Sequence, residues 1–394
     1  MASKFLLWDG NTRSTLLPFT YLRPVSTIRN GILTIHERYE RILGEEVGYL
    51  AIDYLQSKFK TPSADSYIVI DSSAFPTSDF LTAVNLLTIN EGIVDATTNR
   101  LIAAHILQAD LNEDFTNKIN KHISLEIENY LGEKWDIFSH LDYGIRFDYA
   151  LLTSGRNSHE IHNSNIVIGN ELFVEEGAKL FASVINTSTG PVYIGKDAEI
   201  MEGSVIRGPF AIGEHSALKL GTKIYGPTVL GPECKVGGEV NNSVFTAYSS
   251  KAHDGFLGNS VVGEWCNIGA DSNNSNLKNN YENVKLWSIE NKTFEQTGLQ
   301  FCGLFLGDHS KCGINTMFNT GTVVGVSSNI FGAGFPRNFI SSFSWGGASG
   351  FTTYQFDKAI QTADKVLARR KLSLSDEDLE ILQHVFELSR QETV

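Results

Sequence analysis

The sequence predicts a left-handed parallel β-helix over residues 165–345, preceded by a mixed α/β domain and followed by a helical tail. The β-helix is predicted by an aliphatic residue at every sixth position, without a miss, from Ile194 to Val236. An α-helix repeats about every 3.6 residues and a simple strand about every 2, so neither produces this period. A chain that coils as a triangular prism does, because each face is about six residues long and turns one aliphatic side chain inward.

Small residues and glycines accompany this period. Two places before the aliphatic residue the side chain is often small, as a narrow interior requires. Glycine follows it at positions 195, 213, 231 and 237, where we expect sharp bends and positive φ. The period resumes in two later blocks, so chance alignment does not explain it. The inward positions predicted are Ile194, Ile200, Ile206, Ile212, Leu218, Ile224, Leu230 and Val236, then Phe256, Val262 and Ile268, then Leu306, Cys312, Phe318, Val324 and Ile330.

Residues 1–160 alternate strand and helix patterns, which favours a layered α/β domain of the nucleotide-binding type. We expect strands at 5–8 and 67–70, a helix over 34–43, a helix capped by Ser78, a strand pair around the turn 97–99, and helix over 135–152. Residues 350–394 predict two helices, the second opening with a capping box at Ser375, that close the open edge of the last coil.

Composition narrows the class of protein. A chain of 394 residues is long enough for two domains. Its net charge of −13 argues against nucleic acid or an anionic membrane as the main partner. The 4 cysteines show no CxxC spacing and fit the core of a reduced protein. With no signal-peptide pattern and no run of eighteen apolar residues, we expect a cytoplasmic protein.

In the α/β half, two segments are candidates for binding phosphate and one acid is a candidate for binding a metal ion. The loop 9–13 follows the first strand, where phosphates often bind, and it contains Gly10 and Arg13. Arg23 and Arg29 lie in or just after a proline-flanked segment and could clamp a phosphate. Asp71 ends a strand and could bind Mg²⁺. Ordinary turns and solvated surface arginines are the competing interpretations.

In the β-helix half, His253 is the candidate general base, because imidazole accepts protons near neutral pH. A surface histidine stacked on the coil is the competing interpretation. Together with His215 and His309 it also suggests a zinc site, although the spacing of the three gives no sign that they meet.

The motifs of this half carry a resemblance to a known family. They are Lys251-Ala252-His253, Phe256-Leu257-Gly258, Asn267-Ile268-Gly269-Ala270 and Asn276. With the hexapeptide run they resemble the bacterial bifunctional N-acetylglucosamine-1-phosphate uridyltransferase/glucosamine-1-phosphate acetyltransferase family. The whole chain is similar to a shorter, divergent branch of sugar nucleotidyltransferases, most strongly from about 240 to 345.

The resemblance implies roles for these residues. His253 would take a proton from the amine of glucosamine 1-phosphate as it attacks acetyl-CoA. Asn267 and Asn276 would hold the sugar and its amine, and the backbone at Gly269 and Ala270 would face the thioester. It also implies a homotrimer with sites between protomers.

The sequence departs from the family at several of these positions. Phe256 replaces a tyrosine, and Asn241-Asn242 replaces a phosphate-binding lysine pair, for which Lys223 and Lys251 could compensate.

The α/β half departs further. The loop keeps only the Thr12-Arg13 end of a longer glycine-rich loop, and Arg23-Pro24 stands near the family's Pro-Lys pair in reversed order. Asp71 falls where the family places a Mg²⁺-binding aspartate.

The leading prediction is a transferase that binds a sugar phosphate, a nucleoside triphosphate and acetyl-CoA. With Mg²⁺, its α/β half would join a sugar 1-phosphate to the nucleotide and release pyrophosphate. Its β-helix would acetylate glucosamine 1-phosphate, for UDP-N-acetylglucosamine synthesis. Two alternatives stay open: a nucleotidyltransferase with a structural or regulatory β-helix, and an acetyltransferase with a non-catalytic α/β half.

Overall fold

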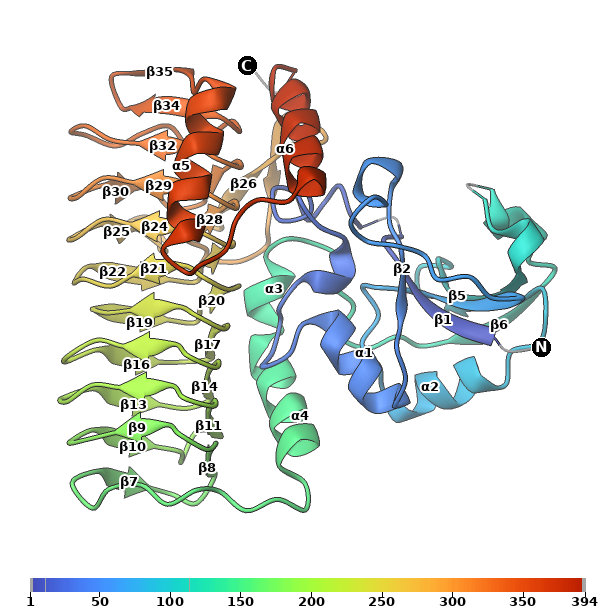
Figure 1. The fold of residues 1–394 in the computed structure, drawn as a ribbon, viewed down its shortest axis with the longest axis horizontal. Helices are drawn as coiled ribbons and strands as arrows, with labels where there is room; N and C mark the ends of the chain where they lie inside the picture. The colour runs from blue at the N-terminus through green and yellow to red at the C-terminus, as the bar shows by residue number, and fades with distance from the viewer. Residues whose placement is uncertain (1–2, 11, 113, 392–394) are drawn as a thin grey trace. The chain divides into compact units, whose positions relative to one another are not determined.

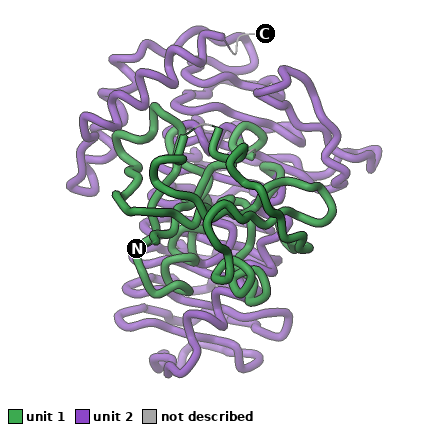
Figure 2. The backbone as a smooth tube through the Cα atoms, turned by 90° about the vertical axis from the view of Figure 1, so that its right-hand side faces the viewer, with its two compact units in different colours: residues 1–16, 22–28, 33–134 green, residues 17–21, 29–32, 135–394 purple. Residues whose placement is uncertain are grey.

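The computed structural model describes residues 3–10, 12–112 and 114–391 (Figure 1). Two compact units are coloured separately in Figure 2. Unit 1 contains residues 1–16, 22–28 and 33–134; unit 2 contains 17–21, 29–32 and 135–394. Residues 135–160 therefore group with the β-helix. The domain boundaries expected from the sequence lie at about residue 160 and at residues 345–350, and these boundaries stay predictions.

Unit 1 is built on a six-stranded mixed sheet in the order β2-β1-β3-β5-β4-β6. Parallel pairing holds for β2, β1 and β3, whereas β5 runs antiparallel to both of its neighbours. The strands are β1 (Ser3–Trp8), β2 (Gly48–Leu50), β3 (Ser66–Asp71), β4 (Glu91–Asp95), β5 (Leu101–Leu107) and β6 (Lys121–Leu125). The expected strand pair around residues 97–99 is the β4–β5 hairpin, in which Asn99 has φ 57°.

Among its described residues, unit 1 has two α-helices. The first, α1 (Ile35–Leu43), confirms the helix expected over 34–43. It begins at a capping box of Thr34 and Glu37 and ends at Gly44 in the left-handed conformation. The second, α2 (Ser78–Asn85), is capped by Thr77 rather than Ser78, because the Thr77 hydroxyl accepts the Phe80 N–H.

Unit 2 contains a three-sided coil of short parallel strands, which fits the predicted β-helix (Figure 1). The first face is β7 (Ile166–Ile168), β10 (Val184–Asn186), β13 (Val205–Arg207), β16 (Lys223–Tyr225), β19 (Glu239–Asn241) and β22 (Phe256–Gly258), extended by the pair β25 (Asn273–Asn274) and β30 (Met317–Phe318). The second face is β8 (Leu172–Val174), β11 (Val192–Ile194), β14 (Phe210–Ile212), β17 (Thr228–Leu230), β20 (Val244–Phe245), β23 (Val261–Val262), β28 (Leu304–Leu306), β31 (Thr322–Val324) and β33 (Phe339–Ile340). The third face is β9 (Lys179–Leu180), β12 (Glu199–Ile200), β15 (Ala217–Leu218), β18 (Lys235–Val236), β21 (Ser250–Lys251), β24 (Asn267–Ile268), β29 (Lys311–Cys312), β32 (Asn329–Ile330) and β34 (Ser344–Gly347). Its last strand, β34, pairs antiparallel with β35 (Gly350–Thr353).

The six-residue period is confirmed as the inward spacing of the coil. All eight aliphatic residues from Ile194 to Val236 are at most 2% exposed and join one core cluster. Ile194, Ile212 and Leu230 stack in register on the second face, one turn of the coil apart. The small residues two places earlier are buried as well: Ala198, Ser204, Ser216, Thr222, Thr228 and Cys234.

One inward position is wrong. The period was expected to resume at Phe256, but Leu257 points inward and is 2% exposed. On the preceding face the inward residue is Lys251, paired with Val236 and 1% exposed. Counting in sixes from Val262 misses Leu257 because the step between these two inward residues is one residue shorter than the period.

The glycines after the aliphatic residues have a different cause from the one expected. Gly195, Gly213 and Gly231 do not have positive φ. A Cβ at Gly231 would lie 1.7 Å from the Thr246 carbonyl oxygen, and one at Gly195 would lie 2.8 Å from the Ile212 carbonyl oxygen. Close approach of successive turns therefore excludes a side chain here.

The rest of unit 2 consists of helices before and after the coil and of a hairpin inserted into it. Helices α3 (Asp136–Ser139) and α4 (Leu141–Thr153) precede it, and a hairpin of β26 (Lys285–Ser288) and β27 (Thr293–Gln296) is inserted between β25 and β28. The tail forms α5 (Phe356–Ala368) and α6 (Asp376–Ser389), the latter with the predicted capping box at Ser375. Phe343 of the coil packs against Phe356 and Phe386. Among the described residues, no helix is both long and apolar enough to cross a membrane.

The inward spacing predicts opposite outcomes for two neighbours on β13. Ile206 is fully buried and Val205 is 49% exposed. Ile206→Ala should lower the free energy of unfolding by about 2–5 kcal/mol, since it leaves a cavity in the stack. Val205→Ala should change it by less than about 0.5 kcal/mol. Urea unfolding checks both; equal losses would contradict the inward spacing.

Candidate functional site

The carboxyl ends of β1 and β3 bring the predicted loop and the predicted acid together. Trp8 pairs with Asp71 in parallel register, so Asp9 and Gly10 follow β1 directly beside the end of β3. Gly10 has φ +56°, and a Cβ on it would lie 2.6 Å from Asp71 Oδ2. Only a glycine therefore fits against the Asp71 carboxylate. Asn11 of the loop lies outside the described residues.

Asp9 connects this edge to the second predicted segment. Its Oδ1 accepts the Val25 N–H at 2.8 Å, which brings the loop carrying Arg23 to the end of β1. Its Oδ2 lies 3.8 Å from Arg13 Nε. The Arg13 guanidinium also donates to the Tyr54 hydroxyl and lies over that ring. Sequence reasoning considered Arg13 and Arg23 but missed Asp9, although an acid directly after a strand was a usable signal.

Arg29, the other arginine expected to bind phosphate, belongs to unit 2. It is buried, and its guanidinium donates to the Ile32 carbonyl and, at 3.2 Å, to the Thr246 carbonyl. Two backbone carbonyls therefore accept hydrogen bonds from the Arg29 guanidinium, which was expected to bind a phosphate.

Burial raises the pKa values of both acids at this edge. The pKa of Asp9 rises to about 7, chiefly through loss of solvation, and the charge of Asp71 raises it further. The pKa of Asp71 rises to about 6, again chiefly through loss of solvation, although hydrogen bonds donated by Ser73 and Tyr130 oppose the shift. Two buried acids that resist ionisation together are a favourable place for a cation.

The donor set fits a magnesium ion. Asp9 Oδ2 is buried and accepts no hydrogen bond. Asp71 Oδ2 accepts one from Tyr130 at 2.8 Å, and Oδ1 accepts one from the Ser73 N–H at 2.8 Å. Mg²⁺ prefers carboxylate oxygens, often only one or two with water and phosphate completing its shell. Asp9 and Asp71 are the residues that would hold it.

In the β-helix, the predicted residues divide between two places. His253 is exposed at the corner that follows β21, between the third and first faces. Gly269 and Ala270 occupy the same corner one turn further along, and the Asp271 N–H donates to the Asp254 carbonyl at 3.0 Å. Asn267, exposed on β24, pairs with Ser250 of β21. These residues therefore lie on consecutive turns.

Asn276 lies elsewhere within the chain. It follows β25 at the far end of the first face, and its amide donates to Asn259 Oδ1 at 2.8 Å. The structure does not bring it to the His253 corner of the same protomer.

The two lysines expected to replace the missing positive charge differ. Lys223 is exposed on the outer side of β16. Lys251 is buried, and its ammonium donates to the carbonyls of Gly237 and His253, each at 2.9 Å. The expectation that Lys251 binds substrate phosphate is corrected, because its charge lies inside the coil.

The three histidines of the zinc alternative lie apart. His215 is at the corner between the second and third faces, 3.9 Å from Asp197 Oδ2. His309 is buried at the same kind of corner and stacks on Trp265. Among the described residues, no three histidine, cysteine or acidic side chains gather as a metal site.

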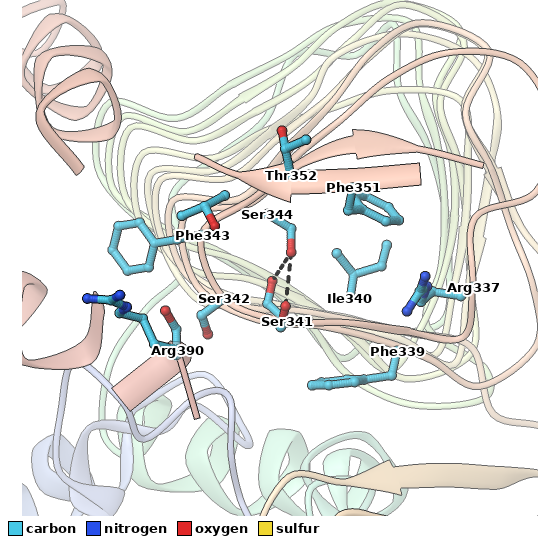
Figure 3. Close-up of a pocket in the computed structure, with 12 residues that line it drawn as sticks. Arg337, Phe339, Ile340, Ser341, Ser342, Phe343, Ser344, Phe351, Thr352 and Arg390 are labelled. Carbon is cyan, nitrogen blue, oxygen red and sulfur yellow. Dashed lines mark hydrogen bonds between the residues drawn. The ribbon is translucent and has the colours of Figure 1, made fainter. Parts of the chain in front are cut away.

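A cavity of about 300 Å³ lies at the end of the coil, and none of the predicted site residues lines it (Figure 3). Hydroxyls, phenylalanine rings and two arginines surround it, with Ser344 Oγ donating to the Ser341 carbonyl at 2.7 Å. Arg337 and Arg390 come from the last turn and from the end of α6. The basic residues that follow α5, Arg369, Arg370 and Lys371, do not line this cavity, and Arg370 pairs with Glu233 of the coil.

Residues 5–157 match a family model described as "Sugar nucleotidyl transferase". This match covers the Asp9–Asp71 edge. The chain is a transferase.

No curated protein matches the chain. Similar solved structures include the Arabidopsis UDP-N-acetylglucosamine acyltransferase, with 15% identity, 57% of this chain and 88% of that chain covered, and a TM-score of 0.28. Another is the polySia specific acetyltransferase NeuO, with 12% identity, 48% and 81% covered, and a TM-score of 0.24.

The raised pKa of Asp9 predicts a pH-dependent stability. The folded protein holds this proton up to about pH 7, whereas an unfolded aspartate with a pKa of 3.8 releases it earlier. Stability from this group is therefore present below pH 4 and is lost as pH rises through about 7. In metal-free buffer, Asp9→Asn should melt a few degrees above the wild type at pH 8 and much closer to it at pH 5.

Differential scanning calorimetry checks this. Asp65→Asn is the matched control, because Asp65 is an exposed acid just before β3, at the opposite end from Asp71. A constant difference between wild type and Asp9→Asn from pH 5 to pH 8 would contradict the burial of an ionisable Asp9.

Proposed function

We propose that unit 1 transfers a nucleotidyl group to a sugar 1-phosphate. An oxygen of the sugar phosphate attacks the α-phosphorus of a nucleoside triphosphate; a new P–O bond forms, the bond to the β-phosphate oxygen breaks, and pyrophosphate leaves. The observation that carries the proposal is the pair of buried carboxylates, Asp9 and Asp71, around Gly10, within the segment that matches sugar nucleotidyl transferases.

Each residue at this edge has a task in that reaction. Asp71 and Asp9 would hold Mg²⁺, which would supply positive charge to offset that of the phosphates. Gly10 lets the loop backbone pass directly beside the Asp71 carboxylate, and N–H groups of this loop would donate to a phosphate. Arg13 and Arg23 supply positive charge to the α-phosphate and the sugar phosphate. Tyr54 orients Arg13 through its hydroxyl.

The second half of the proposal is acetyl transfer at the His253 corner, consistent with the family resemblance of this segment. His253 takes the proton from the amine of glucosamine 1-phosphate while the amine attacks the acetyl-CoA thioester and CoA leaves as a thiol. Its exposure supports this role, because the imidazole is open to a ligand. Asn267 holds the sugar, and the backbone of Gly269 and Ala270 faces the thioester.

In a homotrimer of left-handed β-helices, Asn276 of one protomer meets His253 of the next, which suits their separation within one chain. Together the two reactions produce UDP-N-acetylglucosamine in the cytoplasm.

One observation favours a single activity as the second candidate. Lys251 is inside the coil, so Lys223 is the remaining candidate for the sugar phosphate in place of the family's lysine pair. If Lys223 does not bind the sugar phosphate either, the β-helix has no lysine for it and would serve as a structural or regulatory module of a nucleotidyltransferase.

Nucleotidyl transfer is tested with Asp71→Asn. With UTP, a sugar 1-phosphate and Mg²⁺, pyrophosphate release should fall about a hundredfold or more, because a buried amide is a poor Mg²⁺ ligand. Asp65→Asn, at the other end of β3, should keep wild-type activity. Equal activity in both variants would show that the reaction does not use this edge.

Acetyl transfer is tested with His253→Ala. N-acetylation of glucosamine 1-phosphate by acetyl-CoA should fall at least about a hundredfold, the usual range for a lost general base, while pyrophosphate release stays unchanged. His215→Ala, at another corner of the coil, is the control. Loss of both reactions in His253→Ala would mean that this histidine is structural.

A further inference from the structure

Lys251 occupies a position that aliphatic or cysteine side chains fill elsewhere on the same face. The inward residues of the third face are each at most 4% exposed: Leu180, Ile200, Leu218, Val236, Lys251, Ile268, Cys312 and Ile330. Burial lowers the pKa of Lys251 to about 8, although the charges of Asp254 and Asp271 oppose the shift. A buried ammonium costs free energy that an aliphatic residue would not, so stacking alone does not account for this lysine.

The corners between the third and first faces show what the lysine replaces. At most turns, an inward hydroxyl two places before the first-face core residue donates to a carbonyl of the corner. Ser204 donates to the Met201 carbonyl at 2.8 Å, Thr222 to the Lys219 carbonyl at 2.6 Å, and Thr316 to the Gly313 carbonyl at 2.8 Å. These inward hydroxyls therefore provide hydrogen-bond donors to carbonyls of the corner from inside the coil.

Two successive turns lack that hydroxyl, because the equivalent residues are Gly238 and Gly255. Both are required by the backbone. Gly255 has φ +117°, and a Cβ on it would lie 2.2 Å from the Ser272 carbonyl oxygen. Gly238 has φ +76°, and a Cβ there would lie 2.7 Å from the Gly255 carbonyl oxygen. A serine or threonine therefore does not fit at either position.

The Lys251 ammonium supplies donors to both of these corners. It donates to the Gly237 carbonyl and to the His253 carbonyl, each at 2.9 Å. The Gly237 N–H in turn donates to the Lys251 carbonyl at 2.7 Å. The lysine thus joins two turns of the coil and holds the backbone of the residue whose imidazole is exposed.

We propose that Lys251 is a positioning residue for His253: from inside the coil its ammonium fixes the corner Ala252–Gly255 and so sets the place of the imidazole on the outside. This inference rests on the proposed role of His253 as the general base. Lys251 itself touches no substrate. Its loss should lower kcat for acetyl transfer and leave the KM values nearly unchanged, because the base is displaced while the binding groups stay.

The test compares Lys251→Met with Ile268→Met, the next inward residue of the same face. Lys251→Met should keep or raise the melting temperature, since it removes a buried charge. Its kcat for acetyl transfer should nevertheless fall about tenfold to a hundredfold, as expected for a misplaced base. Amide hydrogen exchange over residues 251–258 should become faster in Lys251→Met and stay unchanged in Ile268→Met.

The proposal is overturned if Lys251→Met retains either the wild-type kcat or the wild-type exchange rates. It is also overturned if Lys251→Met fails to fold while Ile268→Met folds, because the lysine would then serve the core as a whole. Absence of acetyl transfer in the wild type would refute the proposed function instead. Hydrogen exchange would still decide whether Lys251 holds the corner, and unchanged exchange would reject the positioning role.

Discussion

The narrow interior of the coil is the constraint on which unit 2 depends. Each face turns one side chain inward per turn, and successive turns approach so closely that Gly231 has no room for a Cβ. Between the third and first faces, small hydroxyl residues donate to corner carbonyls at most turns. At the His253 corner and at the corner one turn earlier, Gly255 and Gly238 leave no hydroxyl, so Lys251 provides a hydrogen bond to each corner. A polar residue in an aliphatic column thus marks the turn whose outer side carries the proposed chemistry.

The main constraint on unit 1 is the burial of two carboxyl groups at one edge of its sheet. Two parallel strands end side by side, and the acids that follow them, Asp9 and Asp71, are buried with raised pKa values near 7 and 6. Without a cation this arrangement destabilises the folded protein as pH rises, because the carboxylates lose their water. Buried acids with raised pKa values are common at functional sites, where a bound ligand can stabilise their charged form.

The sequence could predict the coil because a period of six needs no tertiary information, and the stack from Ile194 to Val236 follows it throughout. It placed the register wrongly at Phe256, because the step from Leu257 to Val262 is one residue shorter than the period and an aromatic residue stands next to the true inward position. The positions of Gly10 and Asp71 after strands were predictable from local patterns. The bond from the Val25 N–H to Asp9 was not, because it joins segments 16 residues apart through a loop with no regular period.

Whether one chain carries out both proposed reactions is decided by identifying its products. The protein is incubated with glucosamine 1-phosphate, acetyl-CoA, UTP and Mg²⁺, and the products are identified by mass spectrometry. We expect UDP-N-acetylglucosamine together with free CoA and pyrophosphate. N-acetylglucosamine 1-phosphate alone would contradict nucleotidyl transfer at the Asp9–Asp71 edge, and the absence of both products would contradict the bifunctional account for these substrates.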